Sequence, residues 1–504
     1  MTTPSTYQQA IFDFISNGRG DAVVEAVAGS GKTQTLVWAA ERLKTSSALF
    51  VAFNKHIATE LGNRIPNMEC KTIHSIGFAA LQKAESGTRF NVQANKYNDL
   101  VRDLLIRLRP ELATQWKGRT ILTQDGRKLS DTIRAYANFA RLTLTSPNNL
   151  AAMAQFYNLD DLDEYDLPLV RFALENGDVL ARKGIIDFTD MIYLPVAWQI
   201  KMPRLYDWVF VDEAQDLNAA QLEIVSACRL AGGRMVFVGD RFQAIYGFSG
   251  ATPDSIKQIV YRTGATTFPL SVCYRCPKSH IELAKSIVPH IEAADWATEG
   301  EYAELDLNTL FQRVAEGDLI LSRKTAPLIG LCLELIGQRI PARVRGRDIA
   351  AKLVTLLKTI GEMKNFKFEM FPQFADLYKR QQVEKLMKRE GNESRVQAIE
   401  DEVEALQAAY VGFNAASLDD LGKEIESLFT DDRPSVWLST VHRAKGLEAE
   451  RVFIIEPQDL PLTWKGQLDW QYEQEMNLKY VAHTRAKQAL FIVNSNPTAA
   501  AAKV

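Results

Sequence analysis

Ala26-Val27-Ala28-Gly29-Ser30-Gly31-Lys32-Thr33 is the stretch that decides the fold of this 504-residue chain. It follows the apolar run Ala22-Val23-Val24 and precedes a helix-compatible stretch at 34–43, so it lies at a strand-to-helix turn. Such a turn is typical of a phosphate-binding loop, in which backbone N–H groups surround the phosphates, Lys32 reaches the β and γ oxygens and Thr33 holds Mg²⁺. Ala26 stands where the strict pattern has its first glycine, and a Gly-rich turn with a chance lysine is the alternative. The loop predicts a nucleoside triphosphatase.

A second, acidic motif follows another predicted strand. Val209-Phe210-Val211 is a β-branched and aromatic run typical of a buried strand, and Asp212-Glu213-Ala214-Gln215-Asp216 begins at its carboxyl end. Ligands of open α/β sheets collect at that edge. We expect Asp212 to hold Mg²⁺ and Glu213 to polarise the attacking water. The alternative is an acidic helix start, which the helix dipole also favours.

The composition fits a protein of several domains. With 504 residues, 46% of them hydrophobic, we expect roughly three to four domains. The 59 basic and 62 acidic residues nearly cancel, so any nucleic acid would be bound by local patches and stacking. No apolar run reaches transmembrane length, and residues 1–18 show no secretion signal. We expect a soluble cytoplasmic protein, nucleoid-associated or in a host cytoplasm, without a membrane partner.

Five cysteines, at positions 70, 228, 273, 276 and 332, are too few and too scattered for a disulfide framework. Cys273-Tyr274-Arg275-Cys276 is a lone CxxC motif without a second pair of suitably spaced zinc ligands. We therefore expect ordinary reduced thiols.

Strand-like runs alternate with helical patterns, which predicts parallel α/β layers. Two stretches, 98–180 and 363–428, are mainly helical. Within the second, the charged run 381–409 predicts either a coiled-coil hairpin arm or a solvated amphipathic helix pair. The predicted strands are 48–53, 208–211, 235–238, 319–322, 436–439, 452–455 and 489–493.

Other motifs point to nucleic acid. The block Gly239–Gly250 follows a strand and combines Gln243, an amide suited to sensing a γ-phosphate, with two aromatics, Tyr246 and Phe248, that could stack on bases. Phe53-Asn54-Lys55 and Thr72-Ile73-His74-Ser75 add an aromatic, hydrogen-bond donors and a cation after early strands. Each aromatic could instead belong to the core.

Three motifs of the second half place a cation near a strand end. Of these cations, Arg275 and Arg485 are candidates for stabilising charge on a γ-phosphoryl group in the transition state. The alternative is that each pairs with a carboxylate at a domain surface.

The order and content of these motifs resemble the UvrD/Rep/PcrA-like helicases of superfamily 1, from about Gln8 to Val493. Phe53 to Ala58, the Gly239-Asp240…Gln243…Tyr246 block and Tyr480 to Ala486 are most similar to the F-box DNA helicase branch. The resemblance implies an α/β fold with two RecA-like P-loop domains, each with a mainly helical insertion, and ATP between them. It places domain 1A at 1–88 and 183–264, insertion 1B at 89–182, domain 2A at 265–359 and 433–504, and a short 2B-like insertion at 360–432.

The resemblance also assigns roles to individual residues. Lys32, Asp212, Glu213, Gln243, Arg275 and Arg485 would be catalytic, and Thr33 and Asp212 would hold Mg²⁺. ATP would contact Gln8 or Gln9, Ala26, Val27, Ala28, Gly29, Ser30, Gly31, Lys32, Thr33, Gln34 and Glu448. Single-stranded DNA would contact Phe53, Asn54, Thr72, His74, Tyr246, Phe248, Thr440 and His442. Glu475 matches the acid that opens the last motif, and Asp187-Phe188-Thr189-Asp190 resembles a further family block.

The implied activity is that of an ATP-dependent helicase or translocase on single-stranded DNA, with fork or tailed duplex DNA as substrate. The implied polarity is 3′-to-5′, and the implied role is duplex unwinding in repair, recombination or replication, with replication or recombination proteins as partners. Ser249, where the family commonly has arginine, and the shorter second insertion are departures. The alternatives are a translocase that strips proteins from DNA with little unwinding and a non-enzymatic ATP-dependent DNA-binding factor.

Overall fold

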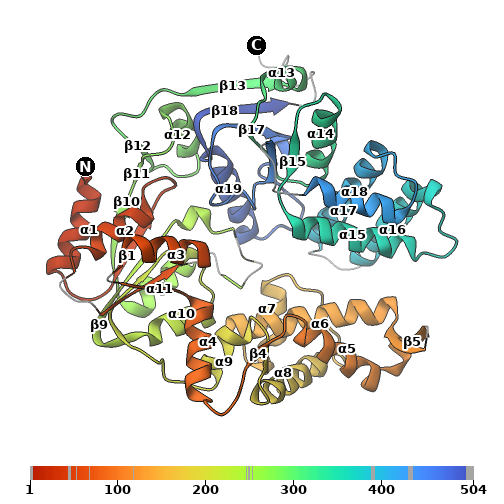
Figure 1. Cartoon of the computed structure of the whole chain (residues 1–504), viewed down its shortest axis with the longest axis horizontal. Helices are drawn as coiled ribbons and strands as arrows, with labels where there is room; N and C mark the ends of the chain where they lie inside the picture. The colour runs from red at the N-terminus through yellow and green to blue at the C-terminus, as the bar shows by residue number, and fades with distance from the viewer. Residues whose placement is uncertain are drawn as a thin grey trace. The chain divides into compact units, whose positions relative to one another are not determined.

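The computed structural model describes residues 4–43, 47–52, 54–66, 68–116, 118–245, 247, 250–251, 254–387, 392–429 and 435–494. The chain divides into two compact units (Figure 1). The first unit comprises Met1–Ala26 and Gly31–Leu270, and the second comprises Val27–Ser30 and Ser271–Val504. Each unit is built on its own six-stranded parallel sheet, as the alternation of strand and helix patterns predicts.

The sheet of the first unit has the strand order β10-β1-β9-β8-β2-β3. One face packs against α1 (Thr6–Asn17), α2 (Lys32–Ala40) and α3 (Lys55–Arg64), and the other against α4 (Ile73–Ala84), α9 (Asp190–Ala197), α10 (Ala219–Ala227) and α11 (Ser255–Thr263). Both faces are therefore apolar, which explains the continuous hydrophobic runs of its central strands. The strands are β1 (Ala22–Ala26), β2 (Ala48–Ala52), β3 (Glu69–Thr72), β8 (Tyr206–Val211), β9 (Arg229–Gly239) and β10 (Thr266–Leu270).

A helical insertion with its own apolar core interrupts the first unit. It contains α5 (Lys96–Leu108), α6 (Gln124–Thr143), α7 (Leu150–Phe156) and α8 (Leu167–Arg182), together with the hairpin of β5 (Ala113–Trp116) and β6 (Arg119–Leu122). At its base β4 (Asn91–Val92) pairs in parallel with β7 (Ile185–Ile186).

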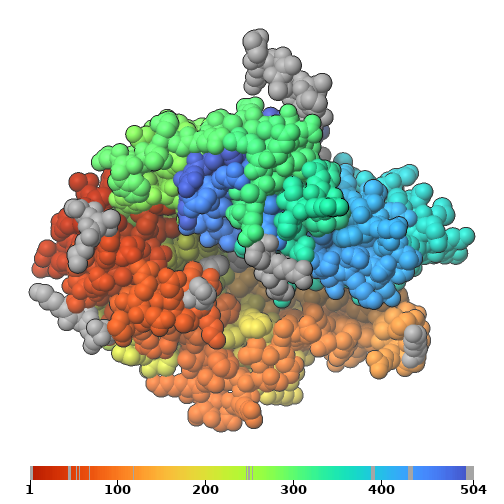
Figure 2. All heavy atoms as spheres, turned by 45° about the horizontal axis from the view of Figure 1, so that its top comes forward, coloured from red at the N-terminus to blue at the C-terminus, as the bar shows by residue number. Residues whose placement is uncertain are grey.

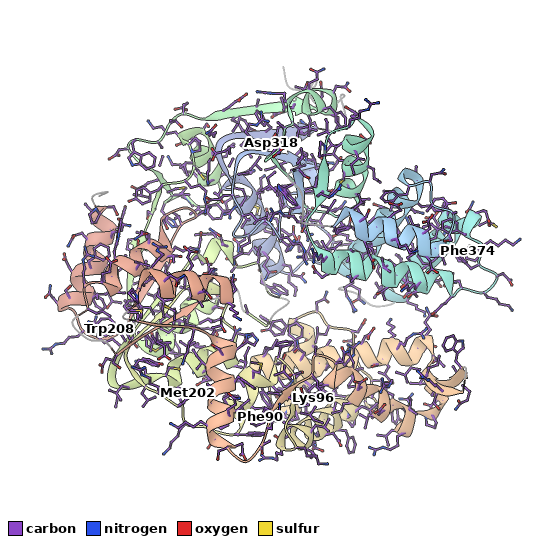
Figure 3. The ribbon with its side chains drawn as sticks, viewed as in Figure 1. Phe90, Lys96, Met202, Trp208, Asp318 and Phe374 are labelled. Carbon is purple, nitrogen blue, oxygen red and sulfur yellow. The ribbon has the colours of Figure 1, made fainter. Side chains whose placement is uncertain are left out.

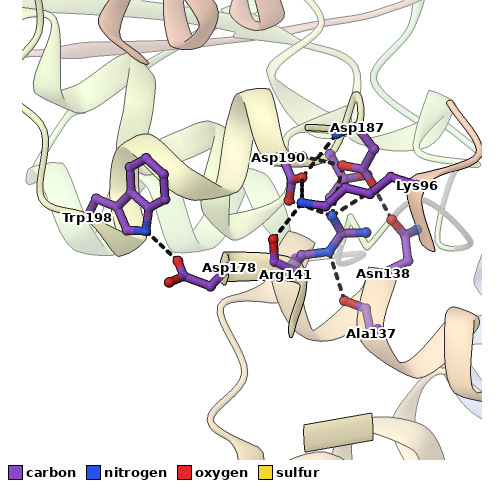
Figure 4. A network of polar contacts seen from close by, with 10 residues as sticks. Lys96, Ala137, Asn138, Arg141, Asp178, Asp187, Asp190 and Trp198 are labelled. Atoms are coloured by element: carbon purple, nitrogen blue, oxygen red, sulfur yellow. Dashed lines mark hydrogen bonds and ion pairs between the residues drawn. The ribbon is translucent and has the colours of Figure 1, made fainter. Parts of the chain in front are cut away.

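A buried ionic network anchors this insertion, as Figure 4 shows. Lys96 of α5, also labelled in Figure 3, lies 2.5 Å from Asp190 and donates to the Gly177 carbonyl at 2.7 Å. Arg141 of α6 donates to Asp187 and to Asp190, each at 2.8 Å. Four buried charges balance one another here, so removing one member would leave the others uncompensated. The network thus ties two insertion helices to the start of α9.

The sheet of the second unit has the strand order β13-β18-β17-β14-β16-β15. Its helices include α12 (Lys278–Lys285), α13 (Leu307–Arg313), α14 (Ala326–Gly337) and α19 (Asp469–His483), and a small parallel pair, β11 (Val272–Cys273) and β12 (Glu292–Ala293), precedes it. The strands are β13 (Glu301–Asp306), β14 (Leu319–Ser322), β15 (Ala342–Val344), β16 (Val436–Thr440), β17 (Ala449–Ile455) and β18 (Ala486–Asn494).

The helical insertion of the second unit shares that unit's core. It consists of α15 (Arg347–Gly361), α16 (Phe371–Met387), α17 (Glu393–Gly412) and α18 (Leu418–Leu428). Apolar residues of α17 such as Val403 and Leu406 belong to the same cluster as residues of β14 and β16. Asp401 of α17 also accepts hydrogen bonds from the Thr325 and Ala326 N–H groups at the start of α14. In Figure 2 these helices form one continuous lobe with α14. The charged run 381–409 thus belongs to an amphipathic helix pair, which was one of the two alternatives. The inner face of this pair is packed against the core and is not solvated.

All seven predicted strands coincide with strands of the two sheets. The predicted list lacked β3, β10, β13 and β15, which are the edge strands of the two sheets. Because β10 pairs with β1, the first unit's sheet runs to Leu270, beyond the predicted domain boundary at 264/265. The five cysteines carry free thiols. Among the described helices, none is long and apolar enough to cross a bilayer.

Candidate nucleotide and nucleic-acid sites

The phosphate loop has the backbone that its glycines allow. Gly31 has φ 74° and precedes α2, and no side chain caps the N-terminus of that helix. The buried Ser30 hydroxyl makes no hydrogen bond to any described residue. In the second unit, to which 27–30 belong, the Ala28 N–H donates to the Tyr480 hydroxyl at 2.8 Å. An uncapped helix start and an unsatisfied hydroxyl are what a bound phosphate would complete.

Three acidic side chains face Lys32 from the first unit. Its Nζ lies 3.2 Å from the Glu213 carboxylate, and the neighbouring Thr33 hydroxyl donates to Asp212 at 2.7 Å. Asp212 and Glu213 follow the carboxyl end of β8, and Asp240 follows that of β9. Glu213 adopts a left-handed backbone with φ 52°, which is unusual for a residue with a side chain. The sequence-predicted lysine, threonine and acids thus come together.

A chain of hydrogen bonds links Glu213 to Gln243. The Gln215 amide donates to Glu213 at 2.6 Å, and its oxygen accepts from the Asp240 N–H at 3.0 Å. Gln243 in turn donates to the Asp240 carboxylate at 2.7 Å. Sequence reasoning did not single out Gln215 and Asp240 as site residues. Asp240 could have been found, because it lies two residues after the predicted strand 235–238, at the same sheet edge.

Burial changes the proton affinity of this cluster. It raises the pKa of both Asp212 and Asp240 to about 6, with the charge of Glu213 adding to the effect and Lys32 opposing it. Burial lowers the pKa of Lys32, but the charges of Glu213, Asp240 and Asp212 outweigh it and leave that pKa raised. Three carboxylates beside one ammonium leave an excess of negative charge, which a bound cation would stabilise.

The donor set fits Mg²⁺ with a nucleotide. Among the described residues, no group of three or more His, Cys, Asp or Glu side chains could hold a metal alone. Mg²⁺ is usually held by one or two carboxylates together with waters and substrate phosphates. Asp212 and Thr33 are the residues that would hold it here.

The structure distinguishes the two glutamines at the start of α1. Gln8 is buried, donates to Thr35 of α2 at 2.9 Å and accepts from the Ser5 N–H at 3.0 Å. Gln9 is exposed and donates to Asp13. Only Gln8 is therefore joined to the phosphate-loop helix. Gln34, a predicted nucleotide contact on α2, accepts a hydrogen bond from Arg64.

In the second unit, Arg275 is paired with a carboxylate. Its Nε donates to Glu448 at 2.7 Å and its Nη1 to the Thr484 carbonyl at 3.4 Å. Glu448 also pairs with Lys487 at 2.5 Å. Partial burial would raise the pKa of Glu448, but the hydrogen bond from Lys487 and the charge of Arg275 leave it lowered.

Arg485 is almost fully buried and binds its own unit. Its guanidinium donates to the carbonyls of Val481 and Leu447 at 2.9 and 3.2 Å and to the Thr484 hydroxyl at 3.1 Å. These contacts join the end of α19 to the segment before β17. Its proposed role at a γ-phosphate stays a prediction.

Glu475 of α19 forms a bidentate pair with Arg323, which directly follows β14. Arg323 Nη2 and Nε donate to the two carboxylate oxygens at 2.6 and 2.9 Å, and the Leu462 N–H donates to the same carboxylate at 3.1 Å. Arg323 was not among the predicted site residues. Its partner is 152 positions away, so no local pattern could indicate the pair.

The predicted DNA contacts of the first unit lie beyond strand ends. Asn54 follows β2 and accepts from the Ile57 N–H at 2.9 Å, while Thr72 ends β3 and accepts from the Ser75 N–H at 3.3 Å. Both side chains therefore cap helices. Burial lowers the pKa of His74. Phe53, Tyr246 and Phe248 lie outside the described residues.

The two predicted DNA contacts of the second unit lie at the end of β16. Thr440 is its last residue and is buried, and the Thr440 carbonyl accepts from the Arg443 N–H at 3.0 Å. Loss of water around the half-buried His442 ring lowers its pKa to about 3, and the charge of Arg323 adds to this.

Comparison with known proteins identifies the class. The family described as UvrD/REP helicase N-terminal domain matches residues 7–262, and the UvrD-like helicase C-terminal domain matches residues 347–496. The chain belongs to the UvrD/Rep helicase family, as the motifs indicate.

Individual relatives agree with the predicted branch. The chain is 27% identical to F-box DNA helicase 1 of Gallus gallus, over 95% of this chain and 48% of that protein. It is 21% identical to F-box DNA helicase protein 1 of Schizosaccharomyces pombe, over 93% of this chain and 55% of that protein. ATP-dependent DNA helicase Rep of Buchnera aphidicola matches 47% of this chain and 37% of its own length at 25% identity. The chain thus spans about half the length of its F-box relatives.

Proposed function

We propose that this protein is an ATP-dependent DNA helicase or translocase that moves along single-stranded DNA in the 3′-to-5′ direction. It would couple Mg²⁺-dependent ATP hydrolysis to duplex unwinding in repair, recombination or replication. The observation that carries the proposal is the cluster in which Lys32 pairs with Glu213 while Thr33 bonds Asp212. Family membership and the names of the relatives support DNA as the substrate.

Within the first unit, each residue has a distinct task. Lys32, Thr33 and the open start of α2 would bind the phosphates, and Asp212 would hold Mg²⁺ through its water shell. The metal, when bound, neutralises charge that develops on the phosphoryl oxygens. Glu213, oriented by Gln215, would accept a hydrogen bond from the attacking water.

The remaining residues connect the nucleotide to the rest of the protein. Gln243 would report the γ-phosphate through Asp240 and Gln215. Gln243 bonds the Asp240 carboxylate, the Asp240 backbone N–H bonds the Gln215 side chain, and Gln215 bonds Glu213. We propose that Gln8, and not Gln9, contacts the adenine base, because only Gln8 is hydrogen-bonded to α2. Arg275 is the cation we propose for the γ-phosphate, with Glu448 holding its side chain.

The test is ATP hydrolysis by the full chain with single-stranded DNA, duplex DNA and RNA. We expect stimulation by single-stranded DNA above the other two. Lys32→Ala should lower the DNA-stimulated rate by at least about 100-fold, because the lysine's charge on the phosphates is lost. Lys285→Ala, which alters an exposed pair with Glu282 on α12, is the matched control and should retain the wild-type rate.

Substantial turnover by Lys32→Ala, in a protein that melts like the wild type, would contradict the assignment. A strand-displacement assay and a protein-displacement assay with the same preparation separate unwinding from stripping. Protein displacement without strand displacement would favour a stripping translocase.

A further inference from the structure

Two cysteines flank Arg275 in the second unit. Cys273 ends β11, and Cys276 lies two residues before α12. Both are free and almost fully buried, with exposed fractions of 0% and 2%. The Cys276 N–H donates to Cys273 Sγ at 3.4 Å, and the single Cys276 S–H, when it does not bond the Thr484 carbonyl, can donate to the same sulfur. The two cysteines are therefore already in contact.

The two thiols differ in acidity. The hydrogen bond from Cys276 and the nearby backbone N–H groups lower the pKa of Cys273 to about 7, although burial opposes this. The same hydrogen bond and burial raise the pKa of Cys276 well above its ordinary value. A thiolate beside a thiol is the arrangement of a nucleophilic and a resolving cysteine.

Burial alone does not explain this pair. Cys228 and Cys332 are equally buried, and burial raises the pKa of each to about 12. The lowered pKa of Cys273 therefore comes from its specific donors. Cys228 and Cys332 are natural internal controls.

The pair is also joined to Arg275 through a shared acceptor. Cys276 Sγ donates to the Thr484 carbonyl at 3.5 Å, and Arg275 Nη1 donates to the same oxygen at 3.4 Å. A Cβ added at Gly29 would lie 2.8 Å from Cys273 Sγ and 2.7 Å from Arg275 Cβ, so the phosphate loop leaves little space there. Any movement of Cys276 toward Cys273 would alter the backbone that carries Arg275.

We propose that Cys273 and Cys276 form a redox-active dithiol that a hydroperoxide converts to an intramolecular disulfide, and that this bond holds Arg275 in an inactive position. The Cys273 thiolate attacks the terminal peroxide oxygen and the O–O bond breaks. The leaving alkoxide, or hydroxide where the oxidant is hydrogen peroxide, takes up a proton and departs as an alcohol or as water. The Cys276 sulfur then attacks the resulting sulfenic acid, the S–S bond forms, and the S–O bond breaks. The hydroxide released from the sulfenic acid leaves as water with the Cys276 proton. The dithiol loses two electrons and the peroxide gains them.

Burial sets the rate of this step. Since neither thiol is open to solvent, the peroxide would react during local opening around β11 and α12. Disulfide formation does not depend on the proposed function, whereas the effect on Arg275 rests on it.

Peptide mapping of the full chain tests the disulfide. The protein is treated with hydrogen peroxide, quenched with a thiol alkylator, denatured in excess alkylator and digested with trypsin without reductant. Trypsin can cut after Arg275, so a Cys273–Cys276 bond leaves two peptides joined together. We expect that joined species, reversed by dithiothreitol, while Cys228 and Cys332 remain alkylatable. Its absence, or equally fast oxidation of Cys228 and Cys332, would overturn the proposal.

ATP hydrolysis tests the consequence. Oxidation should lower the DNA-stimulated rate by about tenfold, and reductant should restore it. Cys276→Ser and Cys276→Ala should keep the basal rate and resist peroxide. A joined peptide with unchanged turnover would overturn the link to Arg275. If the reduced wild type has no ATPase, the proposed function fails while the mapping still decides the disulfide.

Discussion

Lys32 with Glu213 in the first unit and Arg323 with Glu475 in the second are both cation–carboxylate pairs in a parallel α/β sheet unit, but their surroundings differ. Glu475 is satisfied by a bidentate arginine and a backbone N–H. Lys32 faces Glu213, Asp212 and Asp240, and burial raises the pKa of both aspartates to about 6.

This difference separates an ion pair whose charges are balanced from one with excess negative charge beside it. In the second unit one cation meets one carboxylate, so the charges balance within the protein. In the first unit negative charge is left over, and it destabilises the fold until a cation or a proton arrives. An incomplete charge balance at the carboxyl edge of a sheet is therefore a better indicator of a ligand site than an ion pair alone.

The largest expected effect is on turnover. Glu213→Gln should lower DNA-stimulated ATP hydrolysis by about 100- to 1000-fold, because the amide cannot accept a proton from the attacking water. Nucleotide binding, measured with a fluorescent analogue, should persist. Retained hydrolysis would mean that Glu213 is structural, like Glu475.

Changing the second pair should affect stability first. Glu475→Gln leaves Arg323 without its charged partner in a largely buried site and should lower the free energy of unfolding by about 3 kcal/mol. Urea unfolding measures this. The control is Glu282→Gln in the exposed pair with Lys285, which should change stability by less than about 0.5 kcal/mol. If both variants lost the same free energy of unfolding, the Arg323–Glu475 pair would contribute no more to stability than an exposed pair.

The leftover charge predicts a pH dependence. The pKa of Asp240 in the folded protein, about 6, lies above its ordinary value of 3.8, so its protonation favours the fold. This contribution is complete below about pH 4 and is lost as the pH rises through about 6. We therefore compare the change in the free energy of unfolding that Asp240→Asn causes in the metal-free protein at two pH values. This change should be more stabilising at pH 7.5 than at pH 5, by about 1 kcal/mol.

Thermal unfolding at the two pH values measures that difference. The raised pKa of Asp240 would be contradicted if the stability difference between Asp240→Asn and the wild type were the same at both pH values.

The smallest expected effect concerns the glutamine pair. Gln8→Ala removes the bonds to Thr35 and to the Ser5 N–H and should cost about 1 kcal/mol of stability, with weaker ATP binding. Gln9→Ala removes only an exposed bond to Asp13 and should be neutral in both measurements. If Gln9→Ala weakened ATP binding more than Gln8→Ala did, Gln9 would be the residue that contacts adenine.

The sequence predicted the parts of the site that are contiguous in the chain. The phosphate loop around Lys32 and the acids after β8 follow strands whose apolar runs are continuous, so both motif and sheet edge were visible. Edge strand β13, Glu-Tyr-Ala-Glu-Leu-Asp, was missed because its charged residues suit an edge and hide the strand pattern.

What the sequence by itself determined is the chemistry of local segments: a loop that can surround phosphate and carboxylates at a strand end. Only the tertiary structure decided which charges are compensated. Arg323 meets Glu475 and Gln215 joins Glu213 to Asp240 through segments that lie far apart in the chain or on separate strands. Burial and partner geometry, which set the pKa values of Asp212 and Asp240, arise from packing, and no local pattern encodes them.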